Sequence, residues 1–146
     1  MKLDPPQHGA IIRYAYLWAD EHRLGREEAG KDRPTLVLAL SVRSDEGKTE
    51  VLVLAVTHSP PEKSTDAVAL PAEVKRRLRL DSAASYIVTT EANAFVWPGP
   101  DVRPIPGRSP LSVVYGMIPD ALLRAVARSF LANRKRQRVA MVLRTH

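Results

Sequence analysis

The sequence predicts a mainly β fold of the α+β class, a small β-barrel with a short helix and an amphipathic C-terminal helix. Two observations lead to this fold class. Short runs of β-branched, aromatic and aliphatic residues recur between turn residues, enough for five to seven strands. Apolar residues with a helical period occur only in two segments, 71–80 and 118–137. Short strands of this kind commonly close into a barrel, because closure removes exposed sheet edges.

The first half of the chain predicts three strands. The first is expected in residues 10–20, "AIIRYAYLWAD", and a charged loop with two glycines follows at 21–32. The apolar runs 35–43 and 49–57 then flank the turn 44–48. Two apolar runs around a short polar turn are typical of a β-hairpin.

The middle of the chain changes its period twice. Paired prolines make 58–64 a loop, and a short strand is expected at 65–70. The segment 71–80 begins with proline, a favoured first helical residue, and spaces its apolar residues in helical steps. A strand pattern returns at 85–92, and 94–97 extends the sheet.

The last third predicts the clearest helix. Five prolines make 98–110 a loop, and 111–117 is the last expected strand before the helix 118–137. Residues 138–146 fit either a continued helix or a further strand. The apolar face of the helix is expected to hold Leu122, Leu123, Val126, Phe130 and Leu131, and the arginines off that face are Arg124, Arg128 and Arg134.

Composition limits the class of protein. A length of 146 residues, 45% of them hydrophobic, suits one globular domain over residues 1–146. The absence of cysteine excludes disulfides, thiol catalysis and cysteine-bound zinc. No apolar run reaches the roughly 18 residues of a membrane helix, and the polar N-terminus is unlike a signal peptide. We therefore expect a soluble, cytoplasmic protein with no membrane partner.

The net charge of +6 is concentrated near the C-terminus. Residues 1–119 hold 15 basic and 15 acidic residues, whereas residues 120–146 hold seven basic residues and one acid. The basic extension from about residue 132 predicts an anionic partner such as nucleic acid, or else a solvated helix face.

The sequence offers neither a metal site nor a nucleotide cofactor site. The four histidines lack metal-ligand spacing, and no Walker loop, GxGxxG or GxSxG motif occurs. Polar residues stand instead at strand ends, with Arg33 before one strand and Thr57, His58 and Ser59 after the next. Because hairpin strands run antiparallel, these residues are expected at the same open end.

Such a group of residues can hold a phosphodiester, and can cleave one in RNA. Arginine binds phosphate with two parallel hydrogen bonds, and RNA carries its own nucleophile in the 2′-OH. Attack then needs a proton acceptor, a proton donor and a positive group on the phosphorane, but no metal or cofactor. His58, with an imidazole suited to neutral pH, is the candidate base. The alternative is that Arg33, Thr57 and His58 simply face solvent.

The segment "GREEAGKDRPTLVLAL" resembles the signature of the MazF/PemK ribonuclease toxins, in which a G-x-E-x-A-G loop precedes an R-P pair. "LAVTHSPP" is similar to the second family motif, "YIVTTEANAFVW" lies where the third is found, and "YGMIPDALLRAVARSFL" resembles the closing strand and helix. The resemblance covers about residues 9–131. In the third motif, Glu91 and Asn93 stand where an acidic residue and glutamine are usual.

The resemblance implies an SH3-like barrel, a homodimer, metal-independent cleavage of single-stranded RNA, and inhibition by an antitoxin protein. It carries catalytic roles onto Arg33 and Thr57, and it places the loop 21–32 over the RNA. Some relatives on this fold bind DNA gyrase and cleave nothing, and an inactive relative that acts as a binding module is a further alternative. The residues expected to contact RNA are Arg26, Lys31, Ser59, Arg134, Lys135, Arg136 and Arg138.

Overall fold

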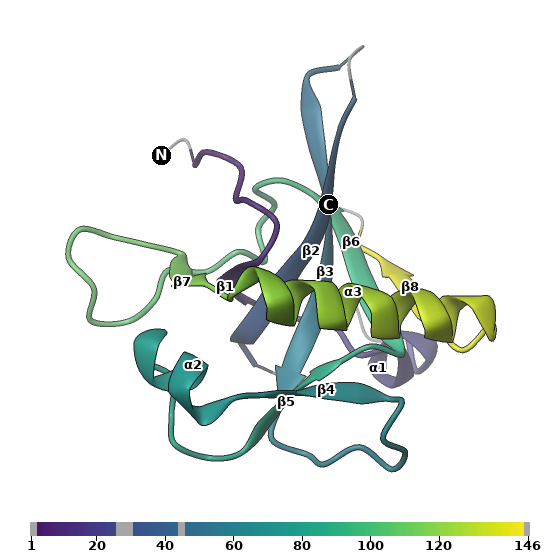
Figure 1. Cartoon of the computed structure of the whole chain (residues 1–146). Coiled ribbons are helices and arrows are strands. Elements are labelled where there is room, and N and C mark those ends of the chain that lie inside the picture. The colour runs from purple at the N-terminus through teal and green to yellow at the C-terminus, as the bar shows by residue number, and fades with distance from the viewer. Residues whose placement is uncertain (1–2, 26–30, 44–45, 145–146) are drawn as a thin grey trace.

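The computed structural model describes residues 3–25, 31–43 and 46–144. Within these ranges a curled, mainly antiparallel sheet forms a half-barrel, with the three helices described there around it (Figure 1). The elements in chain order are β1 (Ala10–Tyr14), α1 (Ala19–Arg23), β2 (Arg33–Arg43), β3 (Lys48–Thr57), β4 (Ala67–Leu70), α2 (Ala72–Arg77), β5 (Ser85–Val88), β6 (Glu91–Val96), β7 (Val114–Met117), α3 (Asp120–Lys135) and β8 (Ala140–Leu143).

The hairpin expected at 35–57 is confirmed as β2 and β3, the two longest strands. β3 curls the sheet because its two halves have different partners. Residues 50–53 pair with β6, whereas Val56 and Thr57 pair with β5. On the other side β2 pairs with β1, and β1 pairs with β7. The hairpin projects beyond the rest of the sheet, and its open end lies at the opposite side, near β5 (Figure 1).

Strand alternation produces two hydrophobic clusters, one on each face of the sheet. Within β1, Ile11 belongs to one cluster and Ile12 to the other, and within β3 the same holds for Leu54 and Val53. This is the period of two expected of a strand covered on both faces. The first cluster contains the aromatic residues of β1, β6 and the segments after them, and the second lies under α2 and α3.

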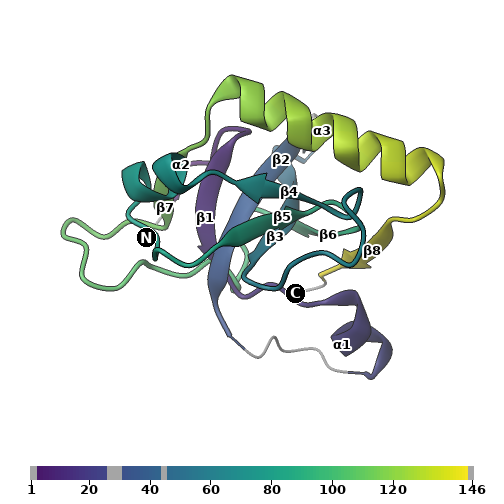
Figure 2. The same cartoon turned by 60° about the horizontal axis from the view of Figure 1, so that its bottom comes forward.

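Helix α3 crosses the sheet from β7 toward β8 (Figure 2). Val126 and Phe130 are buried in the second cluster, as the helical period predicted, and the arginines off that face are exposed. The expectation for Leu131 was wrong, since this residue is 53% exposed. Leu131 follows Phe130 by one position, which rotates it about 100° away from the centre of the buried face.

The strand expected over 10–20 ends at Tyr14, and the loop expected at 21–32 begins with α1 instead. The cause is hydrogen bonding across more than 70 residues of sequence. The side chain of Asn93 accepts from the N–H of Leu17 and donates to its carbonyl, at 2.9 and 2.8 Å. Glu91 Oε1 accepts from the N–H of Ala19 at 2.9 Å. These bonds replace ladder bonds and draw residues 15–19 away from β2.

The end of the chain adds a strand rather than extending the helix. β8 pairs in parallel with β6, and Arg144 after it is buried. Its guanidinium donates to the carbonyl of Ala15 at 2.7 Å and pairs with Asp101 at 3.0 Å. Residues 140–143 are therefore part of the folded sheet. The run expected at 85–92 is divided into β5 and β6 by Thr89 and Thr90.

None of the helices in the described ranges is both long and apolar enough to cross a membrane.

Candidate functional site

A pocket of about 480 Å³ opens at the open end of the β2–β3 hairpin. Arg33, the first residue of β2, and Thr57, the last residue of β3, both line it. The antiparallel register therefore brings them together as the sequence predicted. Its charged and hydroxyl-bearing lining residues are Lys31, Asp32, Arg33, Thr57, His58, Ser59, Lys75, Asp81 and Ser85.

Arg33 is held by stacking rather than by a full set of hydrogen bonds. Its guanidinium carbon lies 4.8 Å from the centroid of the Trp18 ring, within the range of a cation–π interaction. Its Nε is buried and has no hydrogen-bond partner among the described residues. Burial lowers the pKa of Arg33 from its usual value, and the nearby carboxylate of Glu21 opposes this shift. Arginine nevertheless stays protonated in proteins, so the pocket holds a fixed, partly desolvated positive charge.

Trp18 is a member of the site that the sequence did not reveal. The sequence placed it in a strand, where its ring direction could not be assigned. The segment 15–19 instead carries the ring to the pocket, because Asn93 and Glu91 hold that segment in place. Burial raises the pKa of Glu91, whose Oε1 also accepts from the hydroxyl of Tyr16 at 3.2 Å. Glu91 and Asn93 thus hold the backbone on both sides of Trp18, and neither of them lines the pocket.

Thr57 and Ser59 form the β3 rim of the pocket. The hydroxyl oxygen of Thr57 accepts a hydrogen bond from the backbone N–H of Ser59 at 3.2 Å. This local bond fixes the turn that leaves β3. The hydroxyl proton of Thr57 is not used in this bond, so it can be donated to an anion in the pocket.

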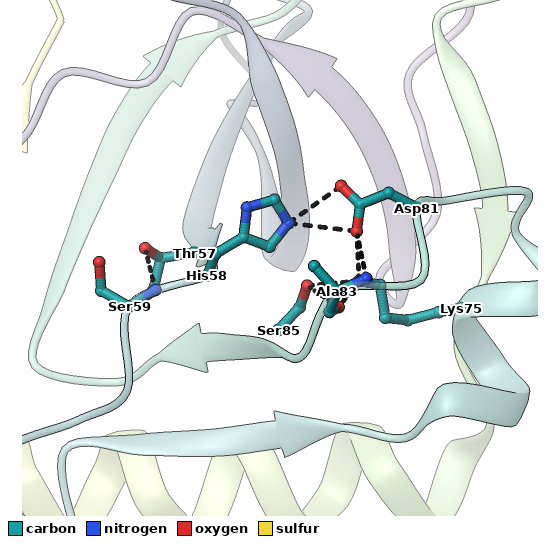
Figure 3. A network of polar contacts seen from close by, with 7 residues as sticks. All are labelled: Thr57, His58, Ser59, Lys75, Asp81, Ala83 and Ser85. Atoms are coloured by element: carbon teal, nitrogen blue, oxygen red, sulfur yellow. Dashed lines mark hydrogen bonds and ion pairs between the residues drawn. The ribbon is translucent and has the colours of Figure 1, made fainter.

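His58 belongs to a hydrogen-bonded chain that runs into the protein (Figure 3). Its Nε2 lies 2.9 Å from Oδ2 and 3.2 Å from Oδ1 of Asp81. Asp81 Oδ1 also accepts from Lys75 Nζ at 2.7 Å. The His58 and Asp81 side chains are each more than half exposed, whereas the Lys75 side chain is 5% exposed.

Lys75 is the buried anchor of this chain. Its ammonium group donates to Asp81, to the carbonyl of Ala83 and to Ser85 Oγ, the last at 2.6 Å. Three acceptors match the three donors of an ammonium group, which offsets the cost of burying the charge. The hydrogen bond from Lys75 is the main reason that the pKa of Asp81 is lowered. Asp81 therefore stays ionised at neutral pH and presents a carboxylate to His58.

The remaining residues expected to contact RNA lie elsewhere. Arg26 is outside the described residues. Arg134, Lys135 and Arg136 are exposed near the end of α3, and none of them lines the pocket. Arg138 is partly covered, because it pairs with Asp66 at 2.9 Å. The pocket thus joins the expected residues of the hairpin, but not those of the C-terminal extension.

The described ranges contain no cluster of three or more histidine, cysteine, aspartate or glutamate residues suited to a metal ion. No protein-family model matches the chain, and no curated protein matches its sequence. The resemblance to the MazF/PemK toxins therefore rests on the motifs quoted above.

Proposed function

We propose that the chain is a metal-independent endoribonuclease toxin that cleaves single-stranded RNA and is neutralised by a cognate antitoxin. It acts as a cytoplasmic homodimer of SH3-like barrels. The observation that carries the proposal is the meeting of Arg33, Thr57 and His58 in one pocket of about 480 Å³. An imidazole can accept the proton of the 2′-OH, a hydroxyl can donate to the phosphate, and a partly desolvated guanidinium can stabilise the phosphorane.

In the proposed reaction the RNA supplies the nucleophile. The 2′ oxygen attacks the adjacent phosphorus, and the bond from phosphorus to the 5′ oxygen breaks. The products are a 2′,3′-cyclic phosphate and a free 5′-OH, after the 5′ oxygen takes a proton from water in the open pocket. The guanidinium of Arg33 stabilises the charge of the phosphorane, and the hydroxyl of Thr57 donates to a non-bridging oxygen.

His58 removes the proton from the 2′-OH. With Nε2 donating its hydrogen to Asp81, the lone pair is on Nδ1, which makes no hydrogen bond within the described part of the chain. Asp81 fixes this tautomer and stabilises the imidazolium that forms, as a carboxylate does for a catalytic histidine in general. Lys75 in turn holds Asp81.

The decisive experiment is an assay of the purified protein on single-stranded RNA in excess EDTA. We expect cleavage that magnesium does not increase. Activity that vanishes with EDTA and returns with magnesium would contradict the proposal. Uncut RNA with a folded protein would instead favour a toxin of the same fold that binds DNA gyrase, or an inactive relative that acts as a binding module.

A further inference from the structure

A second basic hollow, of about 360 Å³, lies between the end of α2 and the loop before β7. Three arginines line it, together with Ser109 and Tyr115. Arg77 is the last residue of α2, Arg79 follows the helix, and Arg108 comes from the proline-rich loop. Among the described residues, none of the three forms an ion pair with an acidic side chain.

The structure holds two of these arginines in place. Arg108 donates to the carbonyl of Val114 at 3.0 Å, and its guanidinium carbon lies 5.3 Å from the centroid of the Tyr115 ring. Arg79 has a φ of +57°, in the left-handed region where glycine is the usual residue. This conformation ends α2, since the N–H of Leu80 donates to the carbonyl of Lys75 at 3.0 Å. Arg79 therefore stands at a helix end where glycine is the usual residue, and it lines the hollow.

Three neighbouring guanidinium groups without acidic partners repel one another, so a bound anion stabilises them. The planar donor fork of arginine matches phosphate oxygens, and an aromatic ring beside it suits the bases of a single strand. Residues 75–81 carry Arg77 and Arg79 and also reach the Arg33 pocket, because Lys75 and Asp81 line that pocket. A polyanion with a phosphate at every unit can therefore occupy both hollows with one chain.

We infer that Arg77, Arg79 and Arg108 form a phosphate-binding subsite for single-stranded RNA whose scissile phosphate lies in the Arg33 pocket. This inference rests on the proposed function and adds a substrate contact to it. The subsite is distinct from the basic extension. α2 and the loop before β7 lie near the start of α3, and the extension lies at its far end (Figure 1).

Two variants of equal charge test the subsite. Arg77→Gln/Arg79→Gly removes two guanidinium groups and places glycine where φ is positive. Arg124→Gln/Arg128→Gln removes two exposed arginines of α3 and serves as the control. The probes are a short and a long 2′-O-methylated oligonucleotide, which lack the 2′-OH nucleophile. Their binding to each protein is measured by fluorescence anisotropy at several salt concentrations.

We expect wild type to bind the long probe more tightly than the short one. The subsite variant should lose about tenfold in affinity for the long probe alone, and its salt slope should fall by about 1.4, at about 0.7 per lost phosphate contact. The control should bind within about twofold of wild type, as expected for arginines outside a binding site. Equal losses in both variants, or no loss in either, would overturn the subsite. Poly-glutamate serves as a third probe, and a subsite variant that loses affinity for poly-glutamate alone would overturn the RNA subsite and assign the hollow to an acidic protein.

Parallel assays on unmodified RNA separate the two proposals. If wild type cleaves RNA and the subsite variant keeps full affinity, the subsite is wrong and the ribonuclease stands. If wild type binds the long probe through Arg77 and Arg79 but cleaves nothing, the ribonuclease is wrong, and the three arginines remain a phosphate-binding site without a scissile phosphate beside it. If wild type neither binds the probes nor cleaves the unmodified RNA, both are wrong.

Discussion

The two sides of the candidate site hold their charged groups in different ways. On the β2 side, the guanidinium of Arg33 stacks on Trp18, and its buried Nε has no hydrogen-bond partner among the described residues. On the β3 side, His58 pairs with Asp81, and Asp81 with Lys75, whose three donors are all used. The Arg33 guanidinium therefore keeps a donor for an anion, whereas the donors of Lys75 are already bonded within the protein.

This difference separates two roles within one pocket. A charge that is desolvated and incompletely bonded gains most when an anion arrives, so Arg33 is suited to stabilise a phosphorane. Hydrogen bonds that are already formed do not strengthen when a ligand binds, but they hold a side chain in one orientation. Asp81 and Lys75 are therefore suited to position the imidazole of His58. Substitutions on the two sides should therefore have effects on RNA cleavage that differ in size and in kind.

The largest effect is expected at Arg33. Arg33→Ala should lower kcat/KM by about 100- to 1,000-fold, the cost of losing one donor to a developing oxyanion. Arg33→Lys should also lose most of its activity, because a point charge replaces a planar fork. Cleavage kinetics are compared with those of Arg124→Ala, an exposed arginine outside the pocket. Near-normal turnover of a folded Arg33→Ala protein would remove Arg33 from the chemistry.

The second largest effect is expected at His58, the proposed general base. His58→Ala should lower kcat by about 100-fold, within the range for loss of a general base. Asp81→Asn keeps a similar shape but removes the carboxylate, and we expect a loss of about tenfold, typical of an outer-shell partner. Single-turnover kinetics give both values. An Asp81→Asn protein as active as wild type would show that the hydrogen-bonded chain does not serve the reaction.

Thr57 should matter less than either. Thr57→Val keeps the branched shape and removes the hydroxyl, so kcat/KM should fall by about tenfold, which corresponds to one hydrogen bond to a charged group. Ser59→Ala tests the neighbouring hydroxyl as a matched control, because Ser59 bonds to Thr57 through its backbone N–H and not through its hydroxyl. A larger loss at Ser59 than at Thr57 would reverse the proposed roles.

The basic extension is expected to affect binding and not chemistry. Changing Arg134, Lys135 and Arg136 to alanine should lower the salt slope of RNA binding by up to about 2, at about 0.7 per phosphate contact, and leave kcat unchanged. Arg138→Ala alone should change the slope little, because Arg138 is already paired with Asp66. An unchanged slope in the triple variant would point to a protein partner for this surface.

The smallest effect concerns acid stability. Because Lys75 lowers the pKa of Asp81, this carboxylate adds stability above its unfolded pKa, and the contribution is lost as pH falls through the lower folded value. The free-energy difference between wild type and Asp81→Asn should therefore shrink between about pH 5 and pH 2. It should stay below about 1 kcal/mol, since the carboxylate is more than half exposed. Urea unfolding at each pH measures this free-energy difference. A difference that grows toward acid pH would refute the proposed contribution of Asp81.

The sequence predicted the parts of this molecule that depend on local patterns. The β2–β3 hairpin followed from two apolar runs around a turn, and α3 from its helical period. The same hairpin placed Arg33 and Thr57 at one open end, so half of the site was predictable.

The other half depends on contacts between distant segments. Trp18 reaches the pocket because Glu91 and Asn93, more than 70 residues away, bind the segment that carries it. Lys75 is buried because the segment that begins at Asp81 closes over it. A lysine in a short helix ordinarily faces water, and the only local signal was its place beside the apolar Val74.

The measurement that tests the central claim most directly uses an RNA with one 2′-deoxy nucleotide at the site that wild type cleaves. If the RNA supplies its own nucleophile in the Arg33 pocket, this single change should abolish cleavage at that site in EDTA. The unmodified RNA should give products that mass spectrometry identifies as a 2′,3′-cyclic phosphate and a 5′-OH. Continued cleavage of the deoxy-substituted RNA, or products with a 5′-phosphate, would show that water attacks the phosphorus and would contradict the mechanism.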